Sequence, residues 1–178
     1  MFAGCSSEEE DVVNRFLSDH SVKDYMHGEF KDLDNDGYKE MYIIDGNFHY
    51  YTMRTPYFRG TPHALLYFEY SSNSFKLDKE LIYSEAMKDI NNITESDNWD
   101  FIPIGDLTSV TTQVTVWEGY LTPPKLISIT SALMFSGREQ EAKKFLNSVW
   151  TDDSLNKESY WQEFKEQLAE SKYWKYTG

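Results

Sequence analysis

Apolar residues recur at helical spacing near the start of the chain and over its last forty positions. A first helix is predicted from Glu8 to Asp19, with acidic residues in its first turn, where they complement the helix dipole. Two further helices are predicted, one starting at Glu139 and one over Ser159–Tyr173. Their expected core-facing residues are Val12, Val13, Phe16 and Leu17, then Ala142, Phe145, Leu146, Val149 and Trp150, then Trp161, Phe164 and Leu168.

Between these helices the pattern changes to that of strands and turns. Apolar residues alternate with polar ones over Tyr25–Lys31, and an apolar, β-branched run leads to Asp45. The run Ala64–Tyr70 predicts another strand, Ser71–Ser74 a turn, and Phe75–Tyr83 its returning hairpin partner. Gly46-Asn47 predicts a further turn before the aromatic run Phe48–Tyr51. The first half of the chain therefore favours a β-meander.

The middle of the chain is less regular. A short helix is predicted over Ser84–Asn92, and β-branched residues over Thr108–Trp117 predict a strand. Leu126–Phe135 is predicted as a strand, with a helix as the alternative that its pattern leaves open. Thr55–Pro62 and Thr94–Asp100 have the composition of loops.

These elements predict an α+β fold. The expected arrangement has an N-terminal helix, an antiparallel sheet, and two C-terminal helices packed on that sheet. The chain has 178 residues, of which 40% are hydrophobic and 16% aromatic, enough for one sizeable core and too few for two full domains. We expect a single domain over residues 11–178, preceded by a polar segment over residues 1–10.

The charge of the chain is strongly negative. Thirty acidic residues against seventeen basic ones give a formal net charge of -13. Such a charge repels phosphate backbones and anionic lipid headgroups, so binding to nucleic acid is not expected. No stretch approaches the roughly 18 consecutive apolar residues that a membrane span requires.

The clearest chemical signal is the stretch KDLDNDGYKEMYIID, which runs from Lys31 to Asp45. Its acidic residues fall at positions 1, 3, 5 and 9 of a calcium-binding loop, and a glycine provides the sharp turn at position 6. A backbone carbonyl at position 7 offers one more oxygen ligand. The predicted calcium ligands are Asp32, Asp34, Asp36, the carbonyl of Tyr38, and Glu40, and calcium is the predicted structural cofactor. The alternative is an Asp- and Gly-rich turn that binds no ion.

The loop differs from an EF-hand at position 12, where Ile43 replaces the usual bidentate glutamate. The residues after Glu40 read as a buried strand instead of an exiting helix, so the loop is expected to join two strands of a hairpin. In this form it resembles the D-x-D-x-D-G-x-x-[DE] loops of FG-GAP and VCBS-type repeats, and the single such loop of many Gram-positive surface lipoproteins. The resemblance implies that Glu40 helps to complete the metal's coordination shell.

The first ten residues also carry a motif. Phe2-Ala3-Gly4-Cys5 resembles the end of a bacterial lipobox, in which a cysteine is lipidated after cleavage, and a polar tether follows it. The resemblance implies a lipid anchor on Cys5 and a location on the outer face of a bacterial membrane. The alternative is an ordinary start of the chain with an incidental cysteine.

Three weaker groups of residues have both functional and structural explanations. His27, His49 and His63 could form a zinc site across neighbouring strands, although their spacing does not specify one. Surface aromatic residues could bind sugars or peptides, and Tyr57, Phe58 and Arg59 form the candidate binding loop; large rings are more often part of the core. The other aromatic residues considered are Tyr50, Tyr51, Trp99 and Trp117, and the carboxylates considered for acid/base chemistry are Glu85, Asp97, Asp100 and Glu118.

Signature motifs of common hydrolases, phosphotransferases and dinucleotide enzymes are missing from the chain. The sequence therefore favours a lipid-anchored binding or interaction module, held outside the cytoplasm, with an unknown glycan, peptide or protein ligand. The alternative function is a cell-surface hydrolase of glycan or peptide that uses carboxylates in a cleft.

Overall fold

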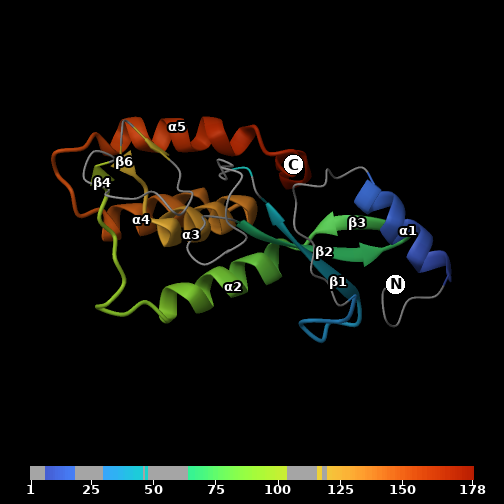
Figure 1. Cartoon of the computed structure of the whole chain (residues 1–178). Helices are drawn as coiled ribbons and strands as arrows, with labels where there is room; N and C mark the ends of the chain where they lie inside the picture. Colours follow the sequence, from blue (N-terminus) through green and yellow to red (C-terminus); the bar gives the residue numbers. More distant parts are fainter. Residues whose placement is uncertain (1–6, 19–29, 46, 48–63, 104–115, 118–119) are drawn as a thin grey trace, which may run out of the picture.

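The computed structural model describes residues 7–18, 30–45, 47, 64–103, 116–117 and 120–178. The fold is α+β, as predicted (Figure 1). Its principal elements are α1 (Ser7–Ser18), β1 (Lys39–Asp45), β2 (Ala64–Ser71), β3 (Ser74–Leu77), α2 (Lys79–Asn91), α3 (Pro124–Phe135), α4 (Glu139–Val149) and α5 (Lys157–Ala169). A single turn of 3-10 helix over Trp174–Thr177 follows α5.

Strands β1, β2 and β3 form an antiparallel sheet in that order. The register places Glu40 opposite Glu69, and Ile43 opposite Leu66. The turn between β2 and β3 has two central residues, Ser72 and Asn73, with φ angles of 52° and 60°. Two positive φ angles are typical of a type I′ turn, whose twist matches that of the flanking strands. The predicted turn over Ser71–Ser74 is thus confirmed.

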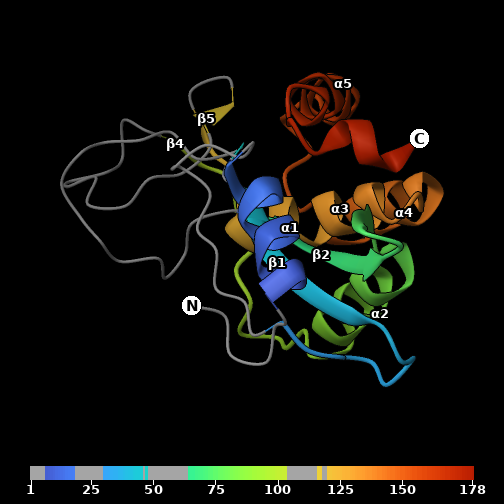
Figure 2. The same cartoon turned by 90° about the vertical axis from the view of Figure 1, so that its right-hand side faces the viewer.

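Both faces of this sheet are covered. On one face, the ring of the buried Phe68 lies 5.1 Å from that of Phe16 on α1 and 5.9 Å from that of Tyr173 beyond α5. On the other face, the charges of Glu85 and Asp89 on α2 act on the side chain of Tyr67. Figures 1 and 2 show α1 on one side of the sheet, with α2, α3 and α4 on the other.

Helix α2 starts earlier than predicted. Its N-cap is Asp78, whose Oδ1 accepts a hydrogen bond of 2.9 Å from the backbone N–H of Leu81. An N-cap aspartate ends the strand and starts a helix, because it satisfies one of the free N–H groups of the first turn. The prediction that Phe75–Tyr83 forms one strand is therefore wrong beyond Leu77, where β3 ends.

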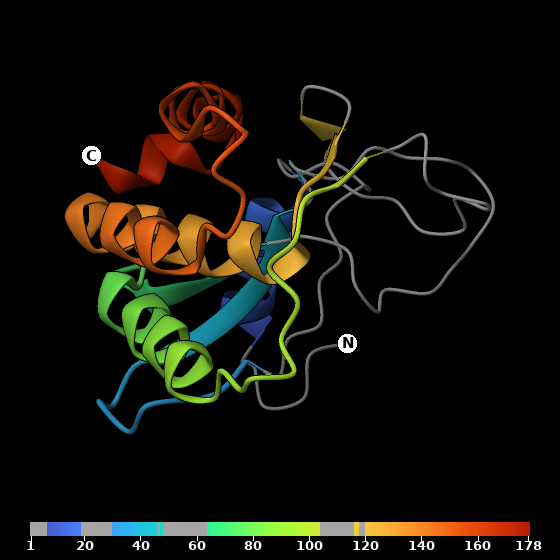
Figure 3. The ribbon, with the colours of Figure 1, turned by 90° about the vertical axis from the view of Figure 1, so that its left-hand side faces the viewer.

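Helix α3 resolves the ambiguity at Leu126–Phe135, which is helical throughout. Its residues from Ile129 to Phe135 are all buried, because it lies between the sheet and the neighbouring helices α2 and α4 (Figure 3). Burial on every side removes the polar stripe that marks a surface helix. The helix ends at Phe135, and Gly137 just beyond it has a φ of 79° that allows Arg138 N–H to donate to the carbonyl of Leu133.

Three two-residue strands, β4 (Ile102–Pro103), β5 (Val116–Trp117) and β6 (Tyr120–Leu121), form a second small sheet in the order β4-β6-β5. The strand predicted over Thr108–Trp117 is described at its last two residues, and the rest lies outside the described residues. The last helix was predicted over Ser159–Tyr173; it starts and ends earlier, at Lys157 and Ala169. In the described parts of the chain, the helices are too short or too polar to cross a bilayer.

Candidate metal centre

The acidic loop is closed at its base by a pair of backbone hydrogen bonds. Lys31 N–H donates to the carbonyl of Glu40 over 3.2 Å, and Glu40 N–H donates to the carbonyl of Lys31 over 2.9 Å. This antiparallel bridge makes residues 32–39 the closed turn of a hairpin that continues into β1. The predicted strand Tyr25–Lys31 is seen as this bridge, and residues 25–29 lie outside the described part of the chain.

Inside the turn, the aspartates hold the backbone in shape by accepting its N–H groups. Asp32 accepts two of these hydrogen bonds, from Asn35 over 2.6 Å and from Gly37 over 3.1 Å. Asn35 and Gly37 have φ angles of 68° and 94°, a region that asparagine and glycine tolerate best. The turn is therefore held by its own hydrogen bonds and backbone conformation, without requiring an ion.

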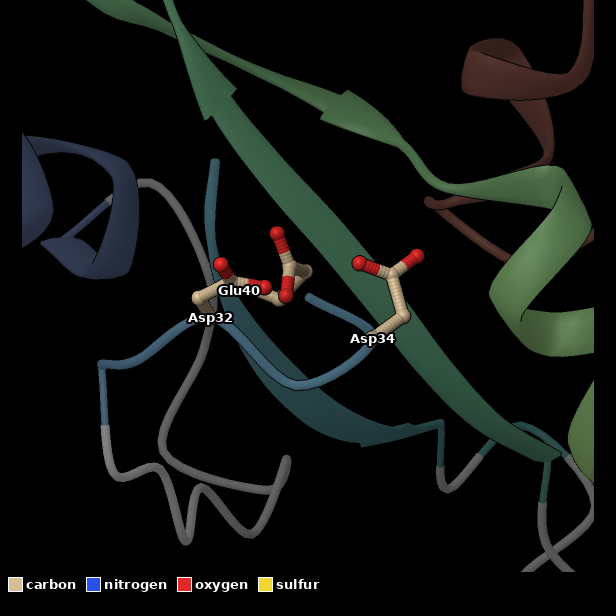
Figure 4. Close-up of side chains that lie close together, drawn as sticks. All are labelled: Asp32, Asp34 and Glu40. Atoms are coloured by element: carbon tan, nitrogen blue, oxygen red, sulfur yellow. The ribbon is translucent and has the colours of Figure 1, made fainter. Parts of the chain in front are cut away.

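Three carboxylates of this loop converge. One oxygen each from Asp32, Asp34 and Glu40 lies within 4.8 Å of the other two, and Figure 4 shows the three groups gathered over the same turn. Three atoms that are each 4.8 Å apart lie ~2.8 Å from their common centre. This distance is close to the 2.3–2.6 Å at which calcium binds oxygen. The cluster can therefore hold a metal ion after small side-chain adjustments.

Glu40 is the unusual member of the cluster. Its side chain is 0% exposed. Oε2 accepts a 2.7 Å hydrogen bond from the backbone N–H of Leu33, whereas Oε1 is buried without a hydrogen-bond partner. Desolvation by burial raises the pKa of Glu40 to about 7; the bond from Leu33 lowers this pKa, and the charges of Asp34, Asp36 and Asp32 raise it further. A buried carboxylate oxygen without a partner is costly unless a proton or a cation neutralises it.

The two remaining predicted ligands lie beside the cluster. Asp36 is exposed, and its Oδ1 accepts a 2.8 Å hydrogen bond from the backbone N–H of Tyr38. Its carboxylate is not one of the three that converge. The side chain of Tyr38 is 49% exposed.

Two further acidic residues, Glu69 and Asp78, are close enough to the loop to be affected by the charges of its aspartates. Glu69 lies opposite Glu40 in the register of β1 and β2. Burial raises the pKa of Glu69, and the charges of Asp36, Asp78 and Asp34 raise it further against the lowering effect of Lys76. The pKa of Asp78 is likewise raised by burial, then by Asp34 and Asp36, despite its bond from Leu81. Both groups extend the negative potential beyond the loop.

The donor set consists entirely of oxygen. Carboxylates are ligands of hard cations, whereas zinc and copper sites usually include histidine or cysteine.

Comparison with protein-family models, with curated proteins and with solved structures finds no match for the chain.

Several residues considered for function lie outside the described part of the chain. These are Cys5, the histidines His27, His49 and His63, the aromatic residues Tyr50, Tyr51, Tyr57 and Phe58, and Arg59 and Glu118. Trp99 is half-buried, with its ring 5.7 Å from that of Phe145 in an edge-to-face arrangement. Trp99 thus packs partly against α4, as core aromatic residues do.

The other carboxylates that we considered each have separate neighbours. Asp97 is held by Lys125, which lowers its pKa together with the N–H of Thr94. Glu85 pairs with Lys88 on the surface of α2. Asp100 accepts a 3.4 Å hydrogen bond from Thr151. These contacts give the three groups local structural roles.

Sequence reasoning missed the roles of Glu69 and Asp78 around the loop. Their proximity depends on the register of β1 and β2 and on the start of α2, neither of which the local pattern specifies. A hairpin alignment that paired Glu40 with Glu69 is the signal that would have revealed the first of them.

Proposed function

We propose that the cluster binds Ca²⁺ and that the chain is a calcium-stabilised binding module on the outer face of a bacterial membrane. The observation that carries the calcium site is the buried, unpartnered Oε1 of Glu40, in a cluster with Asp32 and Asp34. A divalent cation there would satisfy this oxygen and offset the repulsion among the carboxylates.

Calcium suits this loop better than other common cations. Magnesium demands near-ideal octahedral geometry at shorter distances, whereas calcium accepts six to eight oxygens in a flexible shell. A turn that offers up to five oxygen ligands from side chains and backbone suits the flexible shell of calcium. Asp36 and the carbonyl of Tyr38, the next residues of the same turn, are the proposed additional ligands.

The proposed role of the ion is structural. Glu40 is the second residue of β1, and its Oε2 holds Leu33 on the other side of the loop. An ion shared by Asp32, Asp34 and Glu40 would link the start of the loop to the first residues of β1. Calcium would thereby fix the edge of the sheet without taking part in any reaction.

The proposed location is based on the sequence. Cys5 stands in a lipobox-like context, and a lipid on its sulfur would tether the domain to the membrane of a Gram-positive cell shortly before the start of α1. Calcium reaches millimolar concentrations outside cells, where modules with weak sites function. The two parts of the proposal are therefore consistent with each other.

Thermal unfolding with calcium or EDTA tests the metal site. Sites of this class have dissociation constants of about 10⁻⁴ to 10⁻³ M. At 1 mM calcium the native state would gain about 0.4 to 1.4 kcal/mol, or roughly 1 to 5 °C in Tm for a domain of this size. Asp34→Ala should abolish this gain, whereas Asp153→Ala, at an exposed aspartate outside the loop, should retain it. Identical wild-type curves in calcium and EDTA, with no heat of binding by calorimetry, would exclude the site.

A further inference from the structure

The cluster is closed on one side and open on the other. Glu40 is fully buried, whereas Asp32 and Asp34 are exposed, as is the rest of the turn from Asn35 to Tyr38. Calcium needs six to eight oxygens. A cation held by the proposed ligands would therefore keep coordination positions on the solvent side, where water or an oxygen of another molecule can bind.

The same turn carries an exposed aromatic residue. Among the residues whose side-chain exposure the structure describes, Tyr38 is the single large hydrophobic residue that is strongly exposed, at 49%. Its backbone N–H is fixed by the bond to Asp36, so the ring is carried by an ordered backbone. An exposed ring in the same turn as a cluster of polar ligands is a typical arrangement for binding a small polar molecule with an apolar face.

The charge around the loop restricts what that molecule can be. Four carboxylates, those of Asp32, Asp34, Asp36 and Glu40, retain about two negative charges after one Ca²⁺ is bound. Glu69 and Asp78 add to this negative charge: burial is the main cause of the raised pKa of each, and the charges of Asp34 and Asp36 raise both further. A phosphate, a carboxylate or an anionic lipid would be repelled, so the ligand must offer neutral oxygens.

We propose that the solvent side of this loop is a calcium-dependent binding site for a neutral glycan. Hydroxyl oxygens of the sugar occupy the open coordination positions, and the Tyr38 ring packs against its C–H face. The inference rests on the calcium site proposed above and specifies the class of ligand that the module binds. A cationic peptide is the main competitor, and it differs in one respect: it binds the metal-free loop more tightly, because calcium neutralises the charge that attracts it.

Saturation-transfer NMR on the whole chain tests the site with four neutral sugars, D-mannose, D-galactose, L-fucose and chitobiose. In 5 mM calcium we expect at least one to bind, with the signal lost in EDTA. Tyr38→Ala should weaken sugar binding about two- to tenfold, the typical contribution of an aromatic contact, and Tyr38→Phe should retain it. Polylysine and polyphosphate serve as the cationic and anionic comparisons.

Calcium binding is measured separately on each variant by calorimetry, so that the two proposals fail in different ways. Tyr38→Ala retains its backbone carbonyl and should bind calcium like the wild type, whereas Asp34→Ala should lose both calcium and sugar. Calcium binding without any sugar signal overturns the glycan site and leaves the calcium site intact. Sugar binding that persists in EDTA or is unchanged in Tyr38→Ala, or preferential binding of polylysine in EDTA, also overturns it.

Discussion

Glu40 and Asp45 lie at opposite ends of β1 with their side chains on opposite faces of the sheet. They are the buried carboxylates of the described residues, 0% and 3% exposed. Both oxygens of Asp45 accept hydrogen bonds, from Ser171 Oγ over 2.7 Å and from Asn47 N–H over 3.0 Å. In Glu40, Oε2 accepts a hydrogen bond and Oε1 has no hydrogen-bond partner. The protein thus satisfies both oxygens of one buried carboxylate with its own donors and leaves one oxygen of the other without a hydrogen-bond partner.

The bond from Ser171 to Asp45 should stabilise the fold substantially. It joins the segment after α5 to the end of β1, and both residues are buried. Ser171→Ala removes a donor from a buried charged acceptor, so we expect the free energy of unfolding to fall by about 1 to 3 kcal/mol. Urea denaturation measures this loss, and calcium affinity should be unchanged.

Ser148→Ala is the matched control for that substitution. The Ser148 hydroxyl donates to the carbonyl of Phe145 within α4, so it links no separate segments of the chain. Its removal should change stability by less than about 0.5 kcal/mol. Equal effects of the two substitutions would show that the contact between Ser171 and Asp45 contributes nothing beyond a local bond.

Asp78 both caps α2 and lies in the negative field of the loop, and two substitutions separate these roles. Asp78→Ala removes the cap and should cost about 0.5 to 2 kcal/mol of stability. Asp78→Asn retains a good N-cap and removes a charge repelled by Asp34 and Asp36, so in EDTA it should be at least as stable as the wild type. Thermal unfolding of both variants in EDTA measures these changes in stability. If Asp78→Asn loses as much stability as Asp78→Ala, the proposed repulsion between Asp78 and the loop is contradicted.

The carboxylate cluster could be predicted from sequence because its residues are close together in the chain. Asp32, Asp34 and Glu40 lie within one turn, so their convergence follows from residue spacing and from the glycine at position 37. The burial of Glu40 did not follow from spacing. It depends on the packing of β1 against β2 and on the bridge to Lys31.

The errors in the fold have a common cause. Leu126–Phe135 and Phe75–Tyr83 are both rich in apolar residues, and periodicity does not distinguish a buried helix from a buried strand. Helix α3 is surrounded by the sheet and two helices, which removes the polar face that would have identified it. At Asp78, a single capping residue ended the strand within an apolar run.

Lipidation of Cys5 is the prediction on which the proposed location depends. Expressed from its full gene in a Gram-positive host, the protein should incorporate a radiolabelled diacylglycerol and sediment with membranes. Cys5→Ala removes the thiol that accepts the lipid, so this variant should be released into the soluble fraction. Membrane association of Cys5→Ala, or no incorporation of label into the wild type, would contradict the assignment.

The stability of the metal-free protein should depend on pH through Glu40. Its pKa is raised from the ordinary 4.5 to about 7 by burial and by the neighbouring carboxylates. The folded state therefore binds this proton more tightly than the unfolded state does. The resulting stability is fully present below pH 4.5 and is lost as the pH rises through 7. In EDTA, we expect this residue to lower the free energy of unfolding by about 1 to 3 kcal/mol between pH 5 and pH 8.

Comparison with Glu40→Gln isolates this contribution, because the amide does not titrate. Urea denaturation in EDTA at pH 5 and pH 8, for both proteins, gives the difference in pH dependence that Glu40 alone causes. Calcium must displace the proton to bind, so its stabilising effect on the wild type should be small at pH 5 and full at pH 8. Glu40→Gln should show neither the pH-dependent loss nor the calcium effect. Parallel pH profiles for the two proteins would mean that the Glu40 carboxylate is ionised at both pH values, and that the metal-free loop tolerates its charge.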